Sequence, residues 1–239
     1  MATLHFLANP ARFRRFAQRV LPALSVATAL AVAVGLYWAL VIAPPDYQQG
    51  ETVRIMFIHV PAATVAMGGY ILLAVLGASL LVWRHPLAAL MARATAPVGA
   101  TFTAVGLITG SLWGRPMWGT YWVWDARLTS FLLLFFLFLG HIALSRAYDD
   151  PDRGDRAASI LALVGAINVP VIKFSVDWWN TLHQPASIMR LGGPTIDPTI
   201  LYPLLWMMFT FALLFVLLVL LRTDTEIDRR RLEAAELAA

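Results

Sequence analysis

The stretch from Leu21 to Ala43 reads LPALSVATALAVAVGLYWALVIA and contains no charged residue. A helix rises about 1.5 Å per residue, so these 23 residues are long enough to cross a hydrocarbon core of about 30 Å. A secretory signal peptide also begins with basic residues, but its apolar core is only about 7 to 15 residues long. The stretch therefore predicts an uncleaved membrane anchor.

The composition of the whole chain agrees with this interpretation. Of 239 residues, 59% are hydrophobic and 13% are charged, and the mean hydropathy is +0.70. These values are typical of an integral membrane protein and far from those of a soluble domain. The chain has no cysteine, which excludes disulfides, thiolate chemistry and cysteine-ligated metal sites. The net charge of +4 comes from basic residues at the ends of apolar runs, so we expect membrane lipid and not nucleic acid as a partner.

Five further apolar runs complete the expected topology. They cover residues 61–83, 94–112, 128–145, 157–174 and 199–221, after the first span at 21–43. The sequence predicts an all-α integral membrane protein that forms a single domain over residues 1–239, with six transmembrane helices and both termini on one side. The inner segments then hold 13 Lys and Arg residues and the outer segments hold five, which predicts cytoplasmic termini. Lys173 is expected to extend from the fifth span to the outer surface.

Three long connections lie on the predicted outer side, at residues 44–60, 113–127 and 173–198. In the first, Val53, Met56 and Phe57 recur at helical spacing, so we expect a short helix in the membrane interface before the second span. His59 follows it, just before Pro61, which suits the first turn of a helix. The first connection therefore predicts a histidine near the outer boundary.

The middle connection is an aromatic loop that reads WGRPMWGTYWVWDAR from Trp113 to Arg127. Its flat apolar surfaces with polar edges suit a large planar ligand, and its glycines and proline favour turns. The third connection adds Trp178, Trp179 and a second histidine, His183. Neutral imidazole binds iron, copper or zinc, so two histidines beside these tryptophans indicate a haem site.

Simpler interpretations compete with a ligand site. Tryptophans often form an interfacial belt, but six of the nine lie in two outer segments, whereas only Trp83 marks the inner edge of a span. A single histidine is more often structural than a ligand, and this interpretation is kept for His5, His85 and His141. For Arg115, Arg127 and Arg190 two roles are equally expected: contact with lipid headgroups, or binding of a ligand carboxylate.

Three segments of the sequence carry a family resemblance. The run from Trp118 to Ser130 resembles the tryptophan-rich "WWD" segment of the haem-handling membrane proteins of cytochrome c maturation. The segments His59 to Ala63 and Asp177 to Gln184 resemble those around the paired histidines of the six-span member, the haem exporter protein C (CcmC) family. The resemblance covers nearly the whole chain, with the same number of spans and order of loops.

The resemblance implies a haem chaperone at the periplasmic face of the bacterial inner membrane. Haem b iron would be held by His59 and His183, above an aromatic platform with Asp125 and Arg115 beside it; Gly119 would let the backbone come close. The other members of the platform are Trp118, Tyr121, Trp122, Trp124, Trp178 and Trp179. Of the outer cations Arg54, Arg115, Arg127 and Arg190, we expect Arg115 to bind the haem propionates.

The resemblance also implies the partners. Haem would pass to a periplasmic haem chaperone of the CcmE type, with the ATP-binding-cassette subunits CcmA and CcmB and the small protein CcmD as companions. The chain has no GxxxxGK[ST] phosphate loop, so it is not expected to be an enzyme that hydrolyses ATP.

Three other functions are alternatives. A membrane cytochrome b subunit would place paired histidines inside its spans, where the sequence predicts only His141. A transmembrane haem channel would need ionisable groups along the spans, which hold few. An enzyme of the outer face could use His59, Asp125 or Asp177 as acid or base, but no nucleophile and base pair is evident.

Overall fold

The computed structural model describes residues 8–184, 187–188 and 191–236. Within these residues, six helical segments are long and apolar enough to cross a membrane, which confirms the predicted all-helical, six-span fold. The elements are α1 (Pro10–Tyr37), the π-helical turn η2 (Trp38–Ile42), α2 (Val53–Trp83), α3 (Pro86–Trp118), α4 (Ala126–Leu144), α5 (Pro151–Gly165), α6 (Asn168–Trp178) and α7 (Pro198–Glu236). The first span joins α1 to η2, and the fifth joins α5 to α6.

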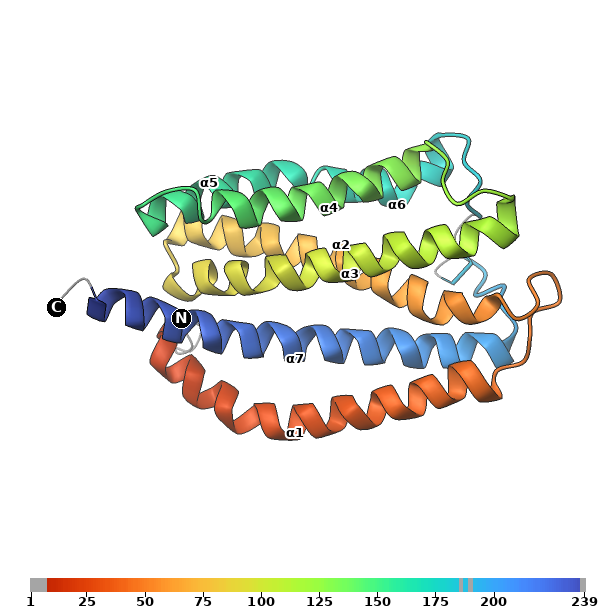
Figure 1. Ribbon diagram of the computed structural model, residues 1–239, viewed down its shortest axis with the longest axis horizontal. Helices are drawn as coiled ribbons and strands as arrows, with labels where there is room; N and C mark the ends of the chain where they lie inside the picture. Colours follow the sequence, from red (N-terminus) through yellow and green to blue (C-terminus); the bar gives the residue numbers. More distant parts are fainter. Residues whose placement is uncertain (1–7, 185–186, 189–190, 237–239) are drawn as a thin grey trace.

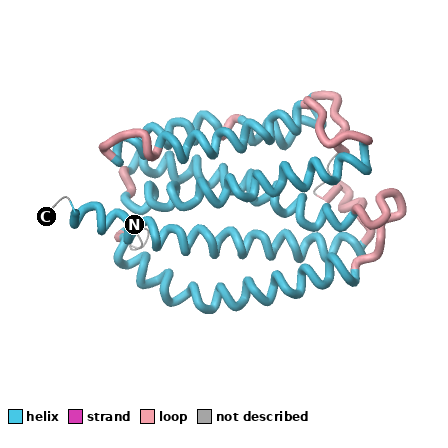
Figure 2. Tube along the Cα trace, viewed as in Figure 1, coloured by secondary structure: helices cyan, strands magenta, loops and turns pink. Residues whose placement is uncertain are grey.

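Helices α2 and α3 form the centre of the bundle (Figure 1). Helices α4, α5 and α6 pack on one side of them and α7 on the other, and α1 packs along α7. The first turn of α1 and the last turn of α7 lie at the same end, which we call the terminal end. The connections 43–52 and 119–125, and the described residues of the connection 179–197, lie at the opposite end, the site end (Figure 2).

Small residues let the central helices pack closely. Ala62 and Ala66 of α2 are fully buried, and Tyr70, further along the same helix, meets the ring of Phe138 edge-on at 4.9 Å between centroids. On α3, a Cβ at Gly99 would lie 2.3 Å from the Phe138 ring. Membrane helices gain little from the hydrophobic effect and associate through such close contacts. The centre of the bundle is thus a tightly packed apolar cluster.

The expected interfacial helix before the second span is not a separate element. Residues from Val53 onward belong to α2, which runs without interruption through Pro61 to Trp83. Val53, Met56 and Phe57 are buried against η2 and α7, in one cluster with Leu204 and Met207. Helical spacing alone does not say whether an apolar face meets lipid or protein, and here it meets protein. Consequently His59 sits in the second turn of a long helix, not in a first turn.

The aromatic loop is shorter than the expected 113–127. Residues 113–118 form the last turns of α3, and Pro116 lies within them although it has no amide hydrogen to donate. Gly119 then adopts a positive φ of 76° and donates its amide to the Arg115 carbonyl, which ends the helix. Asp125 caps the start of α4 by accepting the Leu128 amide at 2.7 Å. Only residues 119–125 form the connection.

The fifth span, expected as one run over 157–174, is broken. Helix α5 ends at Gly165 and α6 begins at Asn168. Pro170 has no amide hydrogen, so it cannot donate to the Ala166 carbonyl as a continuous helix requires. The side-chain amide of Asn168 instead donates to the Ser130 carbonyl of α4 at 2.8 Å. Sequence hydropathy detects the span but not this break.

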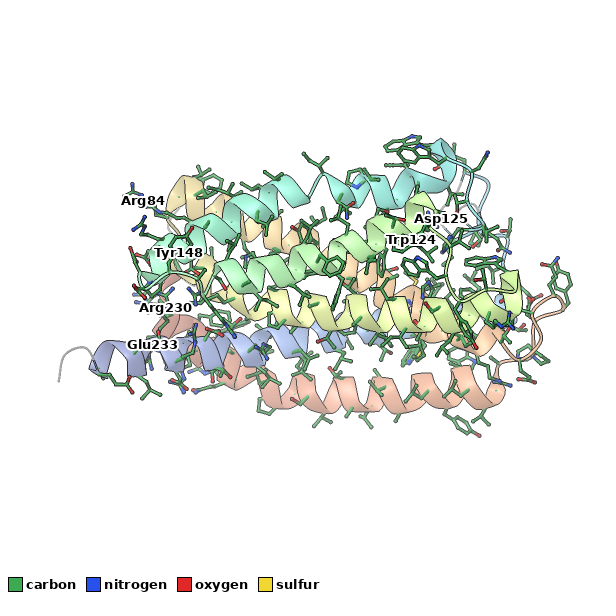
Figure 3. All side chains as sticks on the ribbon, turned by 45° about the horizontal axis from the view of Figure 1, so that its top comes forward. Arg84, Trp124, Asp125, Tyr148, Arg230 and Glu233 are labelled. Atoms are coloured by element: carbon green, nitrogen blue, oxygen red, sulfur yellow. The ribbon has the colours of Figure 1, made fainter. Side chains whose placement is uncertain are left out.

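An ionic cluster joins three helices at the terminal end. The Asp155 carboxylate of α5 accepts from Arg93 of α3 and from Arg230 of α7, each at 2.5 Å. Asp155 and Arg93 have side chains only 4% and 6% exposed. Two positive groups therefore depend on one buried carboxylate. Figure 3 shows Arg230 and Glu233 at this end and Trp124 and Asp125 at the site end.

Substituting Asp155 by Asn should destabilise the protein by about 3 to 5 kcal/mol, because it leaves the buried Arg93 without its anionic partner. Thermal unfolding in detergent measures this effect. The matched control is Asp152→Asn, since Asp152 is 84% exposed and lies 3.7 Å from Arg230. Equal stability of the two variants would contradict the structural role of the cluster.

Candidate functional site

A cavity of about 220 Å³ opens at the site end. Helices α2 and α3 line one part of it, α4 and α6 line another, and the connections carrying Trp122 and His183 complete it. Along α2 it extends from His59 to Met67, so its inner part is apolar. Among the described lining residues there are an Arg and a Lys but no Asp or Glu. The cavity therefore suits a largely apolar ligand with negative groups.

His59 reaches the cavity from α2. Its Nδ1 lies 3.0 Å from the Gly106 carbonyl oxygen and 3.3 Å from the Thr109 hydroxyl, both on α3. Because a carbonyl oxygen only accepts, Nδ1 carries the hydrogen and donates it to Gly106, which leaves Nε2 unprotonated. The Trp113 ring meets the imidazole at 5.6 Å between centroids. The ring is thus held in one orientation with a free lone pair.

His183 reaches the same cavity from the connection between α6 and α7. Its Nδ1 lies 3.3 Å from Asp125 Oδ2 and 3.3 Å from the Thr181 hydroxyl, and the Trp118 ring meets the imidazole at 4.7 Å between centroids. The ionised carboxylate is the stronger acceptor, so Nδ1 donates to Asp125 and Nε2 is again unprotonated. Burial lowers the pKa of His183, and the Asp125 charge offsets only part of this effect. The neutral imidazole therefore dominates near pH 7.

Asp125 performs two tasks with its two oxygens. Oδ1 accepts the Leu128 amide and so caps α4, whereas Oδ2 faces His183. Burial by itself would raise the pKa of Asp125, but hydrogen bonds from the Leu128 amide and the Thr181 hydroxyl outweigh it and lower this pKa. The side chain is 6% exposed and remains ionised. Asp125 is thus a buried carboxylate aimed at an imidazole.

The structure places only part of the expected aromatic platform at the cavity. Trp118 and Trp122 line the cavity. Trp124 packs edge-on against Trp122 at 5.4 Å between centroids but is 75% exposed. Tyr121 is also exposed and lies under the Arg115 guanidinium. Gly119 serves the backbone turn and does not line the cavity.

Trp178 and Trp179 lie outside the cavity. They pack edge-on against each other at 5.7 Å between centroids, and Phe174 of α6 packs beside Trp178 at 5.5 Å. Trp178 is 56% exposed and Trp179 is 50% exposed. This exposed aromatic group at the end of α6 has the position of an interfacial belt.

Of the outer cations, too, only some lie at the cavity. Arg115 is exposed, its guanidinium donates to the Gly119 carbonyl, and it does not line the cavity. Arg54 pairs with Glu51 and donates to the Leu40 carbonyl, so it caps the end of η2. Arg127 and Lys173 do line the cavity. Arg190 lies outside the described residues.

Sequence reasoning missed three residues that hold His59. Gly106 supplies the carbonyl acceptor, and a Cβ at Gly110 would lie only 2.9 Å from His59 Cε1. Trp113 packs on the ring and donates to the Gln49 side chain at 3.0 Å, which ties the first connection to α3. The spacing Gly106-x-x-x-Gly110 is the available signal, because small residues four apart mark close helix contacts.

The arrangement offers two free imidazole nitrogens to one cavity with aromatic walls. Among the described residues no group of three or more His, Asp or Glu could enclose a metal ion. Two imidazoles alone suit a metal whose other ligands come from its own macrocycle. The site therefore fits a planar metal complex better than a bare ion.

The fold and the site define a multi-span helical membrane protein with a two-histidine aromatic site at one end of its bundle. The family model described as Heme exporter protein C, CcmC, matches residues 3–238. The chain belongs to this family of cytochrome c maturation proteins.

Similar proteins agree over nearly the full length. The chain is 58% identical over 235 residues to the Heme exporter protein C of Bradyrhizobium diazoefficiens, which covers 98% of this chain and 89% of that protein. It is 48% identical over 238 residues to the Escherichia coli K12 protein of the same description, covering 98% and 96%. The Rhodobacter capsulatus protein is 41% identical over 230 residues, covering 96% and 95%.

Substituting Gly110 by Ala should destabilise the protein by about 1 to 3 kcal/mol, because the new methyl group overlaps the His59 ring. Thermal unfolding in detergent measures this loss. Gly68→Ala is the matched control on α2, since a Cβ there meets nothing within 4 Å. Adding His59→Ala to Gly110→Ala should remove the added cost. A Gly110→Ala variant as stable as the control would show that the ring is not confined by α3.

Proposed function

We propose that this protein binds haem at its site end and passes it to a periplasmic chaperone during the maturation of c-type cytochromes. Iron is held between Nε2 of His59 and Nε2 of His183. Trp118 and Trp122 contact the porphyrin, and Trp124 supports Trp122 from behind. The family and the relatives named Heme exporter protein C support haem as the ligand.

One observation carries the proposal. The two imidazoles line the same cavity, and each donates its Nδ1 hydrogen to a protein acceptor. A metal-ligating histidine normally donates its second ring nitrogen in this way, which fixes the tautomer and the ring orientation. Both imidazoles thus already have the tautomer and the orientation that binding to iron requires.

The remaining polar groups of the cavity fit the haem propionates. The indole nitrogen of Trp122 is buried and has no hydrogen-bond partner among the described residues. Arg127 already donates to the Ser175 hydroxyl and to the Lys173 carbonyl, which joins α4 to α6. Within the described part of the chain, the Lys173 ammonium makes no hydrogen bond, and it is the only lysine in the sequence. We assign the propionates to Lys173, Arg127 and the Trp122 N–H, in place of Arg115.

The site end faces the periplasm of a bacterial inner membrane in this proposal. The excess of Lys and Arg in the segments at the terminal end supports a cytoplasmic location for that end. Haem held at the site end then lies beside the space where a CcmE-type chaperone accepts it. ATP is hydrolysed by CcmA and CcmB, since this chain has no phosphate-binding loop of its own. The small protein CcmD is a further companion in the assembly.

The visible spectrum of the purified protein tests the axial ligands. The parent protein should show a six-coordinate bis-imidazole haem, and His59→Ala or His183→Ala should show a five-coordinate one. The double variant should lose haem. His141→Gln is the control, because His141 is buried beside a different, small cavity with Arg93 and Glu226. A bis-imidazole spectrum in the double variant would overturn the assignment.

Lys173 should affect haem retention without affecting the iron spectrum. An exposed ion pair contributes about 0.2 to 1 kcal/mol, so Lys173→Gln should speed haem loss to apomyoglobin by up to about five-fold. Lys173→Arg should stay close to the parent rate because it keeps the charge. Arg115→Gln is the matched control outside the cavity. Faster loss from Arg115→Gln than from Lys173→Gln would place the propionates on the other side of the aromatic loop.

A further inference from the structure

The two candidate iron ligands differ in what their Nδ1 atoms face. His59 donates to the uncharged carbonyl of Gly106 at 3.0 Å. His183 faces the Asp125 carboxylate at 3.3 Å. The first acceptor belongs to the backbone of a packed helix, and the second is an ionised side chain that is 6% exposed.

An acceptor with a full negative charge changes what an imidazole can do. It draws the Nδ1 hydrogen away from the ring, so that Nε2 becomes a more basic donor to a metal. A neutral carbonyl has the same effect to a smaller degree, because hydrogen bonds with an ionised partner are about twice as strong as neutral ones. The separation of 3.3 Å is longer than the usual charge-assisted bond. The low exposure of Asp125 compensates, since little water screens its charge.

The two histidines also differ in their anchorage. His59 belongs to α2, and its ring is enclosed by the Gly106 carbonyl, the close backbone of Gly110 and the Trp113 ring. His183 lies outside any helix, in the connection between α6 and α7, where Asp125 and Trp118 hold it. The first ligand is part of the scaffold, and the second is attached to a loop.

From these differences we propose that the two iron bonds are unequal: Asp125 strengthens the bond from His183, so the His59 bond opens first when haem leaves. The inference rests on the proposed function. In the step, His59 Nε2 takes back its lone pair and iron becomes five-coordinate, with no electron or proton transferred. His183 would still hold the haem while His59 no longer does. Asp125 is a positioning residue in this scheme, because it touches His183 and not iron.

Rates of haem loss from single-histidine variants test the order. Haem should leave His183→Ala, which keeps only His59, faster than it leaves His59→Ala, which keeps only His183. Transfer to excess apomyoglobin measures both rates. Equal rates, or slower loss from His183→Ala, would overturn the inference while leaving haem binding intact. A parent protein that holds no haem would overturn the proposed function, and the inference with it.

Asp125→Asn separates the effect on His183 from the cap on α4. Asn is as good an N-cap as Asp, so the start of α4 is kept. Loss of the group that accepts the second ring N–H of a ligating histidine typically weakens metal binding about 10- to 100-fold, so Asp125→Asn should speed haem loss by at least about 10-fold in the His59→Ala background. In the His183→Ala background it should change the rate less than about two-fold. Similar acceleration in both backgrounds would mean that Asp125 acts through the helix, and the inference would fail.

The reduction potential provides an independent readout. A more basic imidazole favours ferric over ferrous iron, so Asp125→Asn should move the potential of the bound haem to a more positive value. Asp177→Asn is the matched control, because Asp177 is exposed on α6, lies near Arg127 and, among the described residues, makes no hydrogen bond or ion pair with either histidine. It should leave the potential close to that of the parent. An unchanged potential in Asp125→Asn, or an equal shift in Asp177→Asn, would contradict the proposed role.

Discussion

The close approach of α2 to α3 is the constraint on which the site depends. Gly110 has no side chain, so the His59 ring can lie against α3 and donate to the backbone carbonyl of Gly106. That carbonyl is part of a helix inside the bundle, which makes the orientation of the imidazole a property of helix packing. The same approach brings Trp113 onto the ring and, through Gln49, holds the first connection in place. Precise placement here comes from helices, not from loop conformation.

The beginning of α4 organises the other half of the site. Asp125 caps the helix and orients His183, and Arg127, two residues later, hydrogen-bonds to Ser175 and to the Lys173 carbonyl of α6. Two other segments, α6 and the connection that carries His183, thus converge on the first turn of α4. Three of these bonds, those of Leu128, His183 and Ser175, are half-buried, so a missing partner there would leave a polar group poorly satisfied. This cost favours one arrangement of the connection over others of similar length.

Hydropathy was sufficient to predict six spans, because length and apolar composition determine which segments can cross a membrane. It could not predict that the apolar side of Val53, Met56 and Phe57 faces η2 and α7, since periodicity does not identify the surface being covered. Turn residues were similarly ambiguous. Gly114, Pro116 and Gly119 all favour a break, but only Gly119 adopts a positive φ, and this placed Arg115 on a helix away from the cavity. The sequence placed Lys173 at the outer surface and offered the Gly106-x-x-x-Gly110 spacing, but that Lys173 and Gly110 line one cavity with His59 depends on contacts between distant helices, which no local pattern shows.

The division of the fifth span into α5 and α6 separates the two ends of the bundle mechanically. Asp155 clamps α5 into the ionic cluster, whereas the Ser175 hydroxyl and the Lys173 carbonyl bind α6 to Arg127. An unbroken helix behaves as a stiff rod and carries a tilt from one end to the other. A helix interrupted at Ala166 and Ile167, beside Pro170, bends there first. A force applied to α5 from the terminal end is therefore absorbed at this joint before it disturbs the alignment of the histidines.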